Sequence, residues 1–555
     1  MIPLRRLMVL GAATVALALS PSPCQAKPSE AAAGPVVNAP AGEVQGLTEG
    51  KLNVFKGIPY AQPPVGQMRW KPPVAAVRWN GIKQATDFGP ACLQPQSRRT
   101  NNIYLGPMLP VSEDCLTLNI WAPADAKNAP VFFWIHGGAL WAGSSQEPTY
   151  DGARLAAQGI IVVSVNYRLG VLGFLAHPEL SAESPLGISG NYGVLDQVQA
   201  LKWVKQNIAA FGGDPANVTI DGQSAGGLSV LYLLASPEAR GLFAKAIAQS
   251  AYMVSTPELK ETKYGTPSSE STGVELMKAL KADNLAALRA MDATELTEAA
   301  AAARFPPFGT IDGHVLPKQL VEIFDKGEQA PVPVMTGFNE GEIRSLRMLA
   351  PPVPDKAERY EKAIRAKYRD LADAFLKLYP SSNMQESIWA TTRDALYGWT
   401  SEKLAVAQTA LGQPSYLYLF DHGYPAADDK GLHAFHAAEL PYMWGTYDRT
   451  PSLWPKVPET KAELKFSGAM MGYWTSFVRD GKPKAAGEPD WPAYDGTRAY
   501  MAFEAVPRPA EHLMPGMYEL VNEVVCRRKA SGDQAWNWNV GLVSPVIPDP
   551  KAECK

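Results

Sequence analysis

One serine of this 555-residue chain stands in a setting that suits a nucleophile. Gly222-Gln-Ser-Ala-Gly226 follows a β-branched run at 218–220 and precedes an apolar, helix-forming run at 228–235. A G-x-S-x-G pattern between a strand and a helix predicts a tight turn that strains the serine backbone and exposes its hydroxyl. The amide groups that open the following helix favour negative charge beside that hydroxyl. We therefore predict that Ser224 is a nucleophile.

A glycine turn upstream of this serine could stabilise the oxyanion that a nucleophilic attack creates. The apolar strand predicted at 131–135 runs directly into His136-Gly-Gly-Ala139. Glycines in this place let backbone N–H groups approach a tetrahedral oxygen without steric obstruction. A Gly-Gly pair after a strand is otherwise only a turn, so the prediction of an oxyanion hole depends on its pairing with the serine turn.

The chain has seven histidines, and their positions narrow the choice of a general base. A serine turn of this kind needs an acid and then a histidine further along the chain. The histidines that follow the best acid candidates are His422, His433, His436 and His512. We favour His436, because it opens a segment in which a loop passes into an apolar, helical stretch. His433 is its main rival.

Two glutamates compete for the role of the acid. The strand predicted at 333–337 ends in a loop that contains Glu340 and Glu342. The end of a parallel strand is where a carboxylate would face the serine turn. Periodicity does not separate the two residues, and both also suit the first turn of an ordinary helix.

Apolar runs predict a mostly parallel sheet that helices cover on both faces. The runs at 129–135 and 159–165 are nearly unbroken, as expected for strands without a solvent-exposed face. The segment 192–211 has helical periodicity and ends at a glycine pair. Further strands are predicted at 244–250, 333–337 and 415–420. This order of elements indicates an α/β fold.

We expect one large domain over residues 27–555, with insertions. Polar, helical stretches at about 253–303 and 354–411 are interpreted as insertions that cover the C-terminal edge of the sheet. Beyond Trp491 we predict an irregular region, followed by a C-terminal tail closed by a disulfide.

Residues 1–26 have the features of a signal peptide. A basic start precedes an apolar run at 7–19, which is too short to span a bilayer, and Cys24-Gln-Ala26 resembles a cleavage site. Its removal leaves four cysteines, for which closeness in sequence favours two local disulfides: Cys92 with Cys115 and Cys526 with Cys554. We therefore expect an exported protein, either periplasmic or secreted.

Composition argues against several classes of function. The net charge of −3 gives no electrostatic reason to expect binding to nucleic acid or to an anionic membrane. The cysteines lack the spacing of a metal site, and no segment after the signal peptide is long enough to span a membrane. We expect no metal and no cofactor, and the sequence does not predict an oligomeric state.

The chain resembles the type-B carboxylesterases, the cholinesterase-like branch of the α/β-hydrolases. The matching segments cover most of the chain: Phe55-Lys-Gly-Ile-Pro-Tyr-Ala-Gln-Pro-Pro-Val-Gly66, Glu113-Asp-Cys-Leu-Thr-Leu-Asn-Ile-Trp121, Asn166-Tyr-Arg-Leu-Gly170, Gly190-Asn-Tyr-Gly193, Phe211-Gly-Gly-Asp-Pro215 and Gly222-Gln-Ser-Ala-Gly-Gly227. The resemblance implies an α/β-hydrolase fold and hydrolysis of small-molecule carboxylic esters through an acyl-enzyme. Two alternatives stay open. One is a hydrolase or acyltransferase for amide, lactone, polyester or toxin esters, and the other is a non-catalytic binding protein.

The resemblance also implies roles for particular residues. The acid motif Gly-x-Asn-x-x-Glu of the family matches in register at Gly337 and Asn339, which places the acid at Glu342. The histidine of the family falls on His436, and Cys92–Cys115 resembles its N-terminal disulfide. The implied oxyanion donors are the backbone N–H groups of Gly138, Ala139 and Ala225.

Three positions depart from the family pattern. Ile343 replaces a glycine after the acid, and Ala139 replaces the third glycine of the oxyanion turn. Asp221 replaces a commonly apolar residue before the serine turn. It is either a hydrogen-bonded carboxylate at a strand end or a second negative charge that makes His436 more basic. Candidates for an apolar substrate pocket are Trp141, Tyr252, Met253, Phe305, Phe308, Phe338, Met348, Tyr442 and Trp444.

Overall fold

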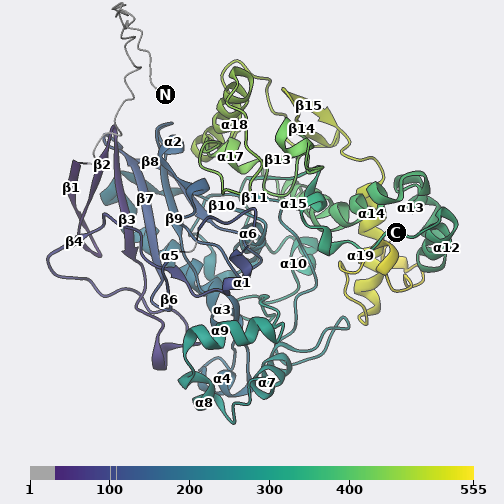
Figure 1. The fold of residues 1–555 in the computed structure, drawn as a ribbon, viewed down its shortest axis with the longest axis horizontal. Helices are drawn as coiled ribbons and strands as arrows, with labels where there is room; N and C mark the ends of the chain where they lie inside the picture. Colours follow the sequence, from purple (N-terminus) through teal and green to yellow (C-terminus); the bar gives the residue numbers. More distant parts are fainter. Residues whose placement is uncertain (1–31, 101, 108, 555) are drawn as a thin grey trace, which may run out of the picture.

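The computed structural model describes residues 32–100, 102–107 and 109–554. The predicted signal peptide, residues 1–26, lies outside the described residues. A large sheet runs through the centre of the molecule, and helices pack on both of its faces (Figure 1).

The described chain forms a 13-stranded sheet in the order β1-β2-β3-β7-β9-β8-β10-β11-β12-β13-β14-β15, with β4 paired to β2. The strands from β9 to β14 in this order are parallel, whereas β1, β2, β3, β7 and β15 pair antiparallel at the two ends. The strands are β1 (Ala32–Ala39), β2 (Gly42–Glu49), β3 (Leu52–Pro59), β4 (Ile82–Gln84), β7 (Thr117–Pro123), β8 (Ala129–Ile135), β9 (Ile161–Val165), β10 (Gly213–Gln223), β11 (Lys245–Gln249), β12 (Val334–Asn339), β13 (Ser415–Phe420), β14 (Ala499–Phe503) and β15 (Pro507–Glu511). A separate pair is β5 (Ala91–Cys92) with β6 (Val111–Ser112).

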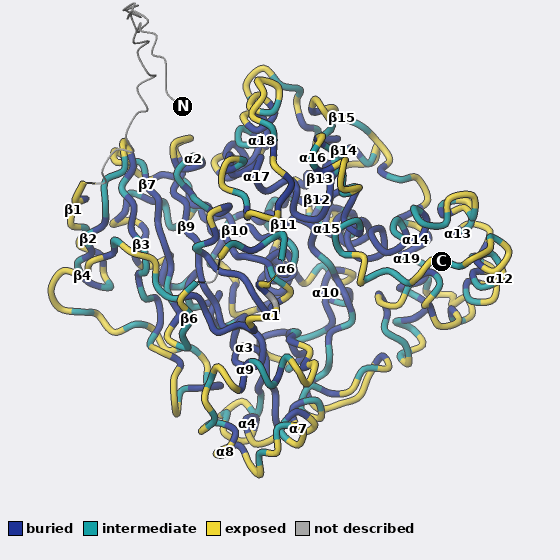
Figure 2. The backbone as a smooth tube through the Cα atoms, viewed as in Figure 1, coloured by how far each residue is buried: buried dark blue, intermediate teal, exposed yellow. Residues whose placement is uncertain are grey.

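The central strands are apolar along their whole length because both of their faces lie in a core. Along β8, Val131, Phe133 and Ile135 pack into one hydrophobic cluster. Their neighbours Phe132 and Trp134 pack into a second cluster on the opposite face. This alternation follows from the two-residue period of a strand. The buried, dark blue centre of Figure 2 is this double core.

Different helices cover the two faces of the sheet. Helices α5 (Tyr192–Asn207) and α6 (Ala225–Ala235) contribute Leu201 and Leu228 to the first cluster. Helix α18 (Lys461–Asp480) contributes Trp474 to the second cluster. The sheet order and this covering on both faces match the predicted α/β architecture.

The remaining helices form two groups and several short connections. In Figure 1, α7, α8 and α9 lie together near α3 and α4, while α12, α13, α14 and α19 gather near the C-terminus. Their bounds are α1 (Gln96–Arg99), α2 (Ala153–Ala156), α3 (Gly170–Phe174), α4 (Pro178–Glu183), α7 (Ser269–Ala279), α8 (Leu285–Ala290), α9 (Ala293–Ala302), α10 (Leu320–Lys326), α11 (Glu342–Ser345), α12 (Ala357–Tyr368), α13 (Ala372–Leu378), α14 (Met384–Arg393), α15 (Trp399–Ala410), α16 (Pro425–Asp428), α17 (Leu440–Met443) and α19 (Met517–Ser531). A π-helical turn at Asp394–Gly398 joins α14 to α15.

The prediction of an irregular region beyond Trp491 is wrong. Strand β14 pairs with β13 and extends the sheet, β15 pairs with β14 at its edge, and α19 follows. Pro507 and Pro509 make β15 difficult to recognise as a strand from the sequence. Proline is nevertheless tolerated in an edge strand, because one row of N–H groups needs no partner there. The stability of β14 comes from its pairing with β13, a strand about 80 residues earlier, which local patterns do not reveal.

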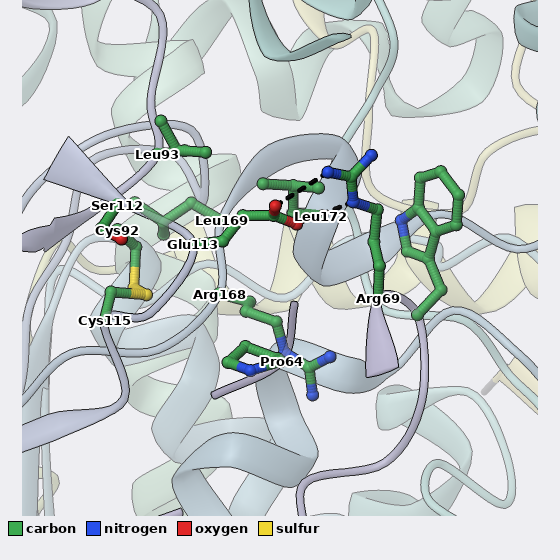
Figure 3. A pocket seen from close by; sticks show the side chains of 11 residues that line it. Pro64, Arg69, Cys92, Leu93, Ser112, Glu113, Cys115, Arg168, Leu169 and Leu172 are labelled. Carbon is green, nitrogen blue, oxygen red and sulfur yellow. Dashed lines mark hydrogen bonds and ion pairs between the residues drawn. A yellow bond between two sulfur atoms is a disulfide. The ribbon is translucent and has the colours of Figure 1, made fainter. Parts of the chain in front are cut away.

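Two disulfides form, Cys92–Cys115 and Cys526–Cys554. The second one ties α19 to the end of the chain. Beside the first lies a cavity of about 10 Å³, which the ion pair between Arg69 and Glu113 also lines (Figure 3). A space of this size holds one water at most, so it is a packing feature of the disulfide loop. No helix of the described residues has both the length and the apolar character that a membrane crossing requires.

Candidate active site

Ser224 occupies a strained turn between β10 and α6. Its backbone has φ 60° and ψ −122°, a region that costs a non-glycine residue free energy and is retained mainly at functional sites. A Cβ atom at Gly222 would overlap Gly226, and one at Gly226 would overlap the carbonyl of Ile135. The Ser224 N–H donates a hydrogen bond of 2.9 Å to the carbonyl of Gln249, which fixes the turn against β11. The spacing of the two glycines is therefore a steric requirement.

The glycine turn after β8 packs directly against this serine. A Cβ atom at Gly137 would lie 3.2 Å from the Cβ of Ser224. Gly138 has φ 111°, and a Cβ atom there would overlap the carbonyl of Ala142. Ala139 has φ 56°, which an alanine adopts only with strain. Within the described residues, the N–H groups of Gly138 and Ala139 donate no hydrogen bond, so both are available to a ligand.

The N-terminus of α6 supplies the third predicted donor. The Leu228 N–H bonds to the Ser224 carbonyl, which makes Ser224 the N-cap of the helix. The N–H groups of the first helical turn have no acceptor within their own helix, and Ala225 is the first of these residues. The glycine turn and the N-terminus of α6, which is the positive end of the helix dipole, thus both lie beside Ser224.

Glu342 and His436 are in direct contact, although 94 residues separate them. The carboxylate Oε2 of Glu342 meets Nδ1 of His436, and Oε1 accepts a hydrogen bond of 2.9 Å from the Asn339 N–H. Glu342 opens α11 directly after β12 and is fully buried, while His436 is 4% exposed. A carboxylate at Nδ1 holds the proton on that nitrogen, which leaves Nε2 free to accept one.

The other ring nitrogen of His436 faces the residue before the predicted nucleophile. Its Nε2 lies 3.3 Å from the side-chain amide Nε2 of Gln223. Within the described residues, the Oγ of Ser224 forms no hydrogen bond. Hydrogen bonds between a nucleophile and its base are often long or absent without substrate. The imidazole therefore points at the serine turn, with the amide of Gln223 at its basic nitrogen.

Glu340 and His433, the rival candidates for the acid and the base, have other partners in the structure. Glu340 turns away from His436 and accepts a hydrogen bond of 2.8 Å from Arg393. His433 lies between Asp421 at 2.8 Å and Asp428 at 3.0 Å. Hydrogen bonds to these carboxylates raise the pKa of His433 to about 9, so this imidazole is protonated at neutral pH. Both ring nitrogens of His433 contact carboxylates, so neither is available to a serine.

One group of side chains has the composition of a metal site. Glu340, Asp421 and His433 bring one ligand atom each within 4.8 Å of one another. Each is already engaged within the chain, Glu340 by Arg393 and His433 by Asp421. Because the carboxylates keep His433 protonated, its nitrogens are not available as metal ligands at neutral pH.

Asp221 is fully buried beneath the serine turn and does not contact His436. Its Oδ1 accepts a hydrogen bond of 3.0 Å from the Gln249 amide, and its Oδ2 has no partner among the described residues. Burial raises the pKa of Asp221 well above its ordinary value, which favours the uncharged acid. Of the two interpretations, the structure favours the hydrogen-bonded carboxyl group over a second negative charge.

Three residues near His436 were missed by sequence reasoning. Glu439 is fully buried and accepts a hydrogen bond of 2.6 Å from Asn339. Burial and the charge of Glu342 raise its pKa to about 7. The rings of Tyr104 and Tyr397 lie 5.8 Å and 5.5 Å from the imidazole. Only the spacing of Glu439, three residues after His436, gave any signal in the sequence.

The residues predicted to line an apolar pocket lie in different parts of the structure. Tyr252 packs beside Tyr397, with ring centroids 6.2 Å apart, and so lies next to the site. Tyr442 and Trp444 are fully buried in the second core cluster. Met348 is 78% exposed. Aromatic character alone does not distinguish a pocket wall from a core, because both bury apolar surface.

Comparisons with known proteins identify the family. Residues 33–516 match the model of the carboxylesterase family. The chain is 36% identical to the fumonisin B1 esterase of Sphingopyxis macrogoltabida, over 83% of this chain and 85% of that protein. It is also 36% identical to the para-nitrobenzyl esterase of Bacillus subtilis, over 83% of this chain and 92% of that protein. The solved structure of a thermophilic PNB esterase is similar, with a TM-score of 0.76 and 33% identity, over 87% of this chain and 99% of that one.

The chain belongs to the carboxylesterase family. Its fold is that of the α/β-hydrolases, as the sequence predicts, and it is an enzyme that hydrolyses carboxylic esters. This carboxylesterase carries its strained serine, its glycine turn and its Glu342–His436 contact at one edge of the parallel sheet, after strands β10, β8, β12 and β13. That edge is where α/β folds bind their ligands.

Proposed function

We propose that this carboxylesterase acts through a triad of Ser224, His436 and Glu342 and an acyl-enzyme intermediate. The contact between Glu342 and His436 is the observation that carries the proposal, because it orients the imidazole toward the turn of Ser224. The strained backbone of Ser224 supports the same assignment. Hydrolysis of an ester by a serine requires this combination of an oriented base and a presented hydroxyl.

The proposed reaction has two halves. His436 Nε2 takes the proton of Ser224 as Oγ attacks the ester carbonyl, and then gives it to the departing alcohol. Water, activated by the same nitrogen, hydrolyses the acyl-enzyme and releases the acid. Glu342 stays ionised and stabilises the imidazolium in both halves. The N–H groups of Gly138, Ala139 and Ala225 donate hydrogen bonds that stabilise the negative charge developing on the carbonyl oxygen.

Gln223 must release His436 before the proton is transferred. Its amide occupies the nitrogen that Ser224 needs, at 3.3 Å. We propose that the acyl group of a bound substrate displaces this contact. Between turnovers, the amide of Gln223 then keeps the imidazole of His436 in the same orientation.

The proposal is tested by Ser224→Ala with chromogenic acetate and butyrate esters. We expect kcat/KM to fall by roughly 10⁴–10⁶, and the burst of one alcohol per enzyme to vanish. Ser236→Ala is the matched control, since Ser236 caps the other end of α6 and its buried Oγ has no partner in the described part of the chain. Full turnover by purified, folded Ser224→Ala would rule out the triad.

Substrate class and acyl transfer are open within this scheme. The same acyl-enzyme serves amide, lactone, polyester or toxin esters, and alcohols or amines in place of water would yield transfer products. Assays with added alcohol or amine acceptors, read by product mass, distinguish hydrolysis from transfer.

We also propose that the protein is exported as a single domain comprising residues 27–555. The signal-like sequence at 1–26 and the two disulfides support export, because disulfides persist in oxidising compartments. The mature N-terminus should be Lys27 by mass spectrometry, and cell fractionation should recover the activity outside the cytoplasm. A single calorimetric unfolding transition is the expectation for one domain.

A further inference from the structure

A π-helical turn carries one tyrosine into the site. Residues Asp394–Gly398 form five π-helical residues within the otherwise α-helical stretch from α14 to α15. Such turns are rare, and they occur frequently at functional sites because the extra residue redirects a side chain. Tyr397 lies in this turn, and its ring packs 5.5 Å from the imidazole of His436.

Within the part of the chain that the structure describes, the hydroxyl of Tyr397 has no hydrogen-bond partner. The residue is 3% exposed, yet within the described chain its hydroxyl forms no hydrogen bond. The hydroxyl oxygen is not fully enclosed by the surrounding atoms, so the small exposed surface of Tyr397 includes this oxygen. Buried tyrosine hydroxyls normally find a partner, as that of Tyr379 does in Asp394 of the same π-helical turn. The hydroxyl of Tyr397 is therefore an unpaired donor that a ligand can reach, on a ring that lies beside His436.

Tyr252 presents a second hydroxyl of the same kind. It follows β11, three residues after Gln249, whose carbonyl accepts the Ser224 N–H. Its ring lies 6.2 Å from that of Tyr397. Its hydroxyl also has no hydrogen-bond partner among residues 32–100, 102–107 and 109–554, and it is not fully enclosed. Tyr104, whose ring also lies beside His436, differs because its hydroxyl already donates to Ser345 at 2.7 Å. Of these three tyrosines, Tyr397 and Tyr252 thus carry a hydroxyl that can bind a ligand, whereas that of Tyr104 is already engaged.

The charges around the hydroxyls of Tyr252 and Tyr397 indicate which kind of ligand group they can bind. Burial raises the pKa of Tyr252 and of Tyr397, so both hydroxyls remain protonated donors at neutral pH. The charge of Glu342 further raises the pKa of Tyr397, and the same charge would repel an anionic group placed there. A neutral oxygen acceptor suits two neutral donors in this field.

We propose that Tyr397, together with Tyr252, determines specificity for esters that carry a neutral oxygen acceptor, such as a keto or ether group, a few bonds from the scissile carbonyl. The proposal rests on the proposed serine mechanism. The hydroxyls donate to that oxygen and hold the ester against the imidazole. A purely aliphatic ester of equal length gains no hydrogen bond from either hydroxyl, so it is turned over less efficiently than an ester that carries the acceptor.

The test compares 4-nitrophenyl 4-oxopentanoate with 4-nitrophenyl pentanoate, which differ only in the keto oxygen. Tyr397→Phe removes the hydroxyl and keeps the ring. We expect its kcat/KM to fall roughly tenfold for the oxo ester, mainly through KM, and less than twofold for the pentanoate. Tyr252→Phe should act in the same direction. Tyr104→Phe is the matched control, and it should change both esters by the same factor.

A second pair places the oxygen in the alcohol, 2-methoxyethyl pentanoate against butyl pentanoate, with acid release followed by titration. Selective loss in either pair supports the proposal and identifies the side of the ester that meets the tyrosines. Equal changes for both members of both pairs, in a variant with wild-type melting temperature, would overturn it. Failure of the serine mechanism would be seen separately, as turnover by Ser224→Ala.

Discussion

The side-chain amide of Gln223 lies 3.3 Å from Nε2 of His436, the nitrogen that takes the proton in the proposed reaction. Glu342 holds the opposite nitrogen, so the imidazole is fixed at both ends before substrate arrives. An uncharged amide can occupy this place without changing the charge of the site. A carboxylate in the same place could not, because it would favour the imidazolium.

Gln223→Glu tests this relationship. A negative charge at this distance stabilises protonated His436, so the acidic limb of kcat/KM should move to higher pH by about one unit. Gln223→Leu keeps the size and brings no charge, and its acidic limb should stay in place. An acidic limb that does not move in Gln223→Glu would show that this side chain does not face His436 in solution.

The buried carboxyl of Asp221 should affect stability and not the base. Because burial raises its pKa, the folded state binds a proton that the unfolded state releases above about pH 4. This contribution is present at low pH and is lost as pH rises toward the raised pKa. Asp221→Asn should therefore gain stability relative to wild type as pH increases, measured by urea unfolding. The acidic limb of its kcat/KM should be unchanged, and a displaced limb would restore the view of Asp221 as a second charge.

Glu439 should make stability fall between about pH 4.5 and 7. Its pKa in the folded protein is raised to about 7, so the folded state holds the proton in this range and the unfolded state does not. The loss amounts to about 3 kcal/mol by pH 8. Glu439→Gln should remove this loss, as measured by urea unfolding at pH 4 and pH 8.

Glu402→Gln is the control for Glu439→Gln. Burial also raises the pKa of Glu402 to about 7, but this residue lies against Tyr494, outside the site. Both variants should gain stability at pH 8, while only Glu439→Gln should alter the pH profile of kcat/KM. An altered profile in both would mean that the effect is global.

Gly138→Ala should abolish most activity. The added Cβ overlaps the carbonyl of Ala142, so the turn must shift and its N–H groups leave the oxyanion. We expect kcat to fall by about 10²–10³, the typical effect of losing one such donor. Ala139→Gly relieves the positive φ of 56° and should add roughly 1 kcal/mol of stability with kcat within a few-fold of wild type. The melting temperature of Gly138→Ala shows whether the loss is local.

The two disulfides should differ in their contribution to stability. They close loops of similar size, 23 and 28 residues, each of which predicts about 3 kcal/mol from chain entropy. Cys92 and Cys115 are 2% and 1% exposed, whereas the other pair is partly exposed. Paired Cys→Ala replacements should therefore cost more at Cys92–Cys115, where a buried cavity is also left. Equal losses of melting temperature would contradict the role of burial.

Local patterns were sufficient for much of this protein. The apolar runs of β8 and β9, the turn at Ser224 and the glycines after β8 were predicted from sequence, because strand character and tight turns depend on neighbouring residues. Strands β14 and β15 and helix α19 were not predicted. The two strands form because they pair at the edge of the sheet, and the apolar periodicity of α19 is weak.

The partners within the site were decided by the tertiary structure. By themselves, the residue types left Glu340 beside Glu342 and His433 beside His436, and the family resemblance supplied the choice between them. The structure brings Glu342 and His436 together across 94 residues, and Gln223 and His436 across 213. Such contacts depend on the order of strands in the sheet, which places the ends of β10, β12 and β13 near one another. Sequence determined which groups could react, and the sheet order decided which of them meet, because periodicity describes one element and never the distance between two.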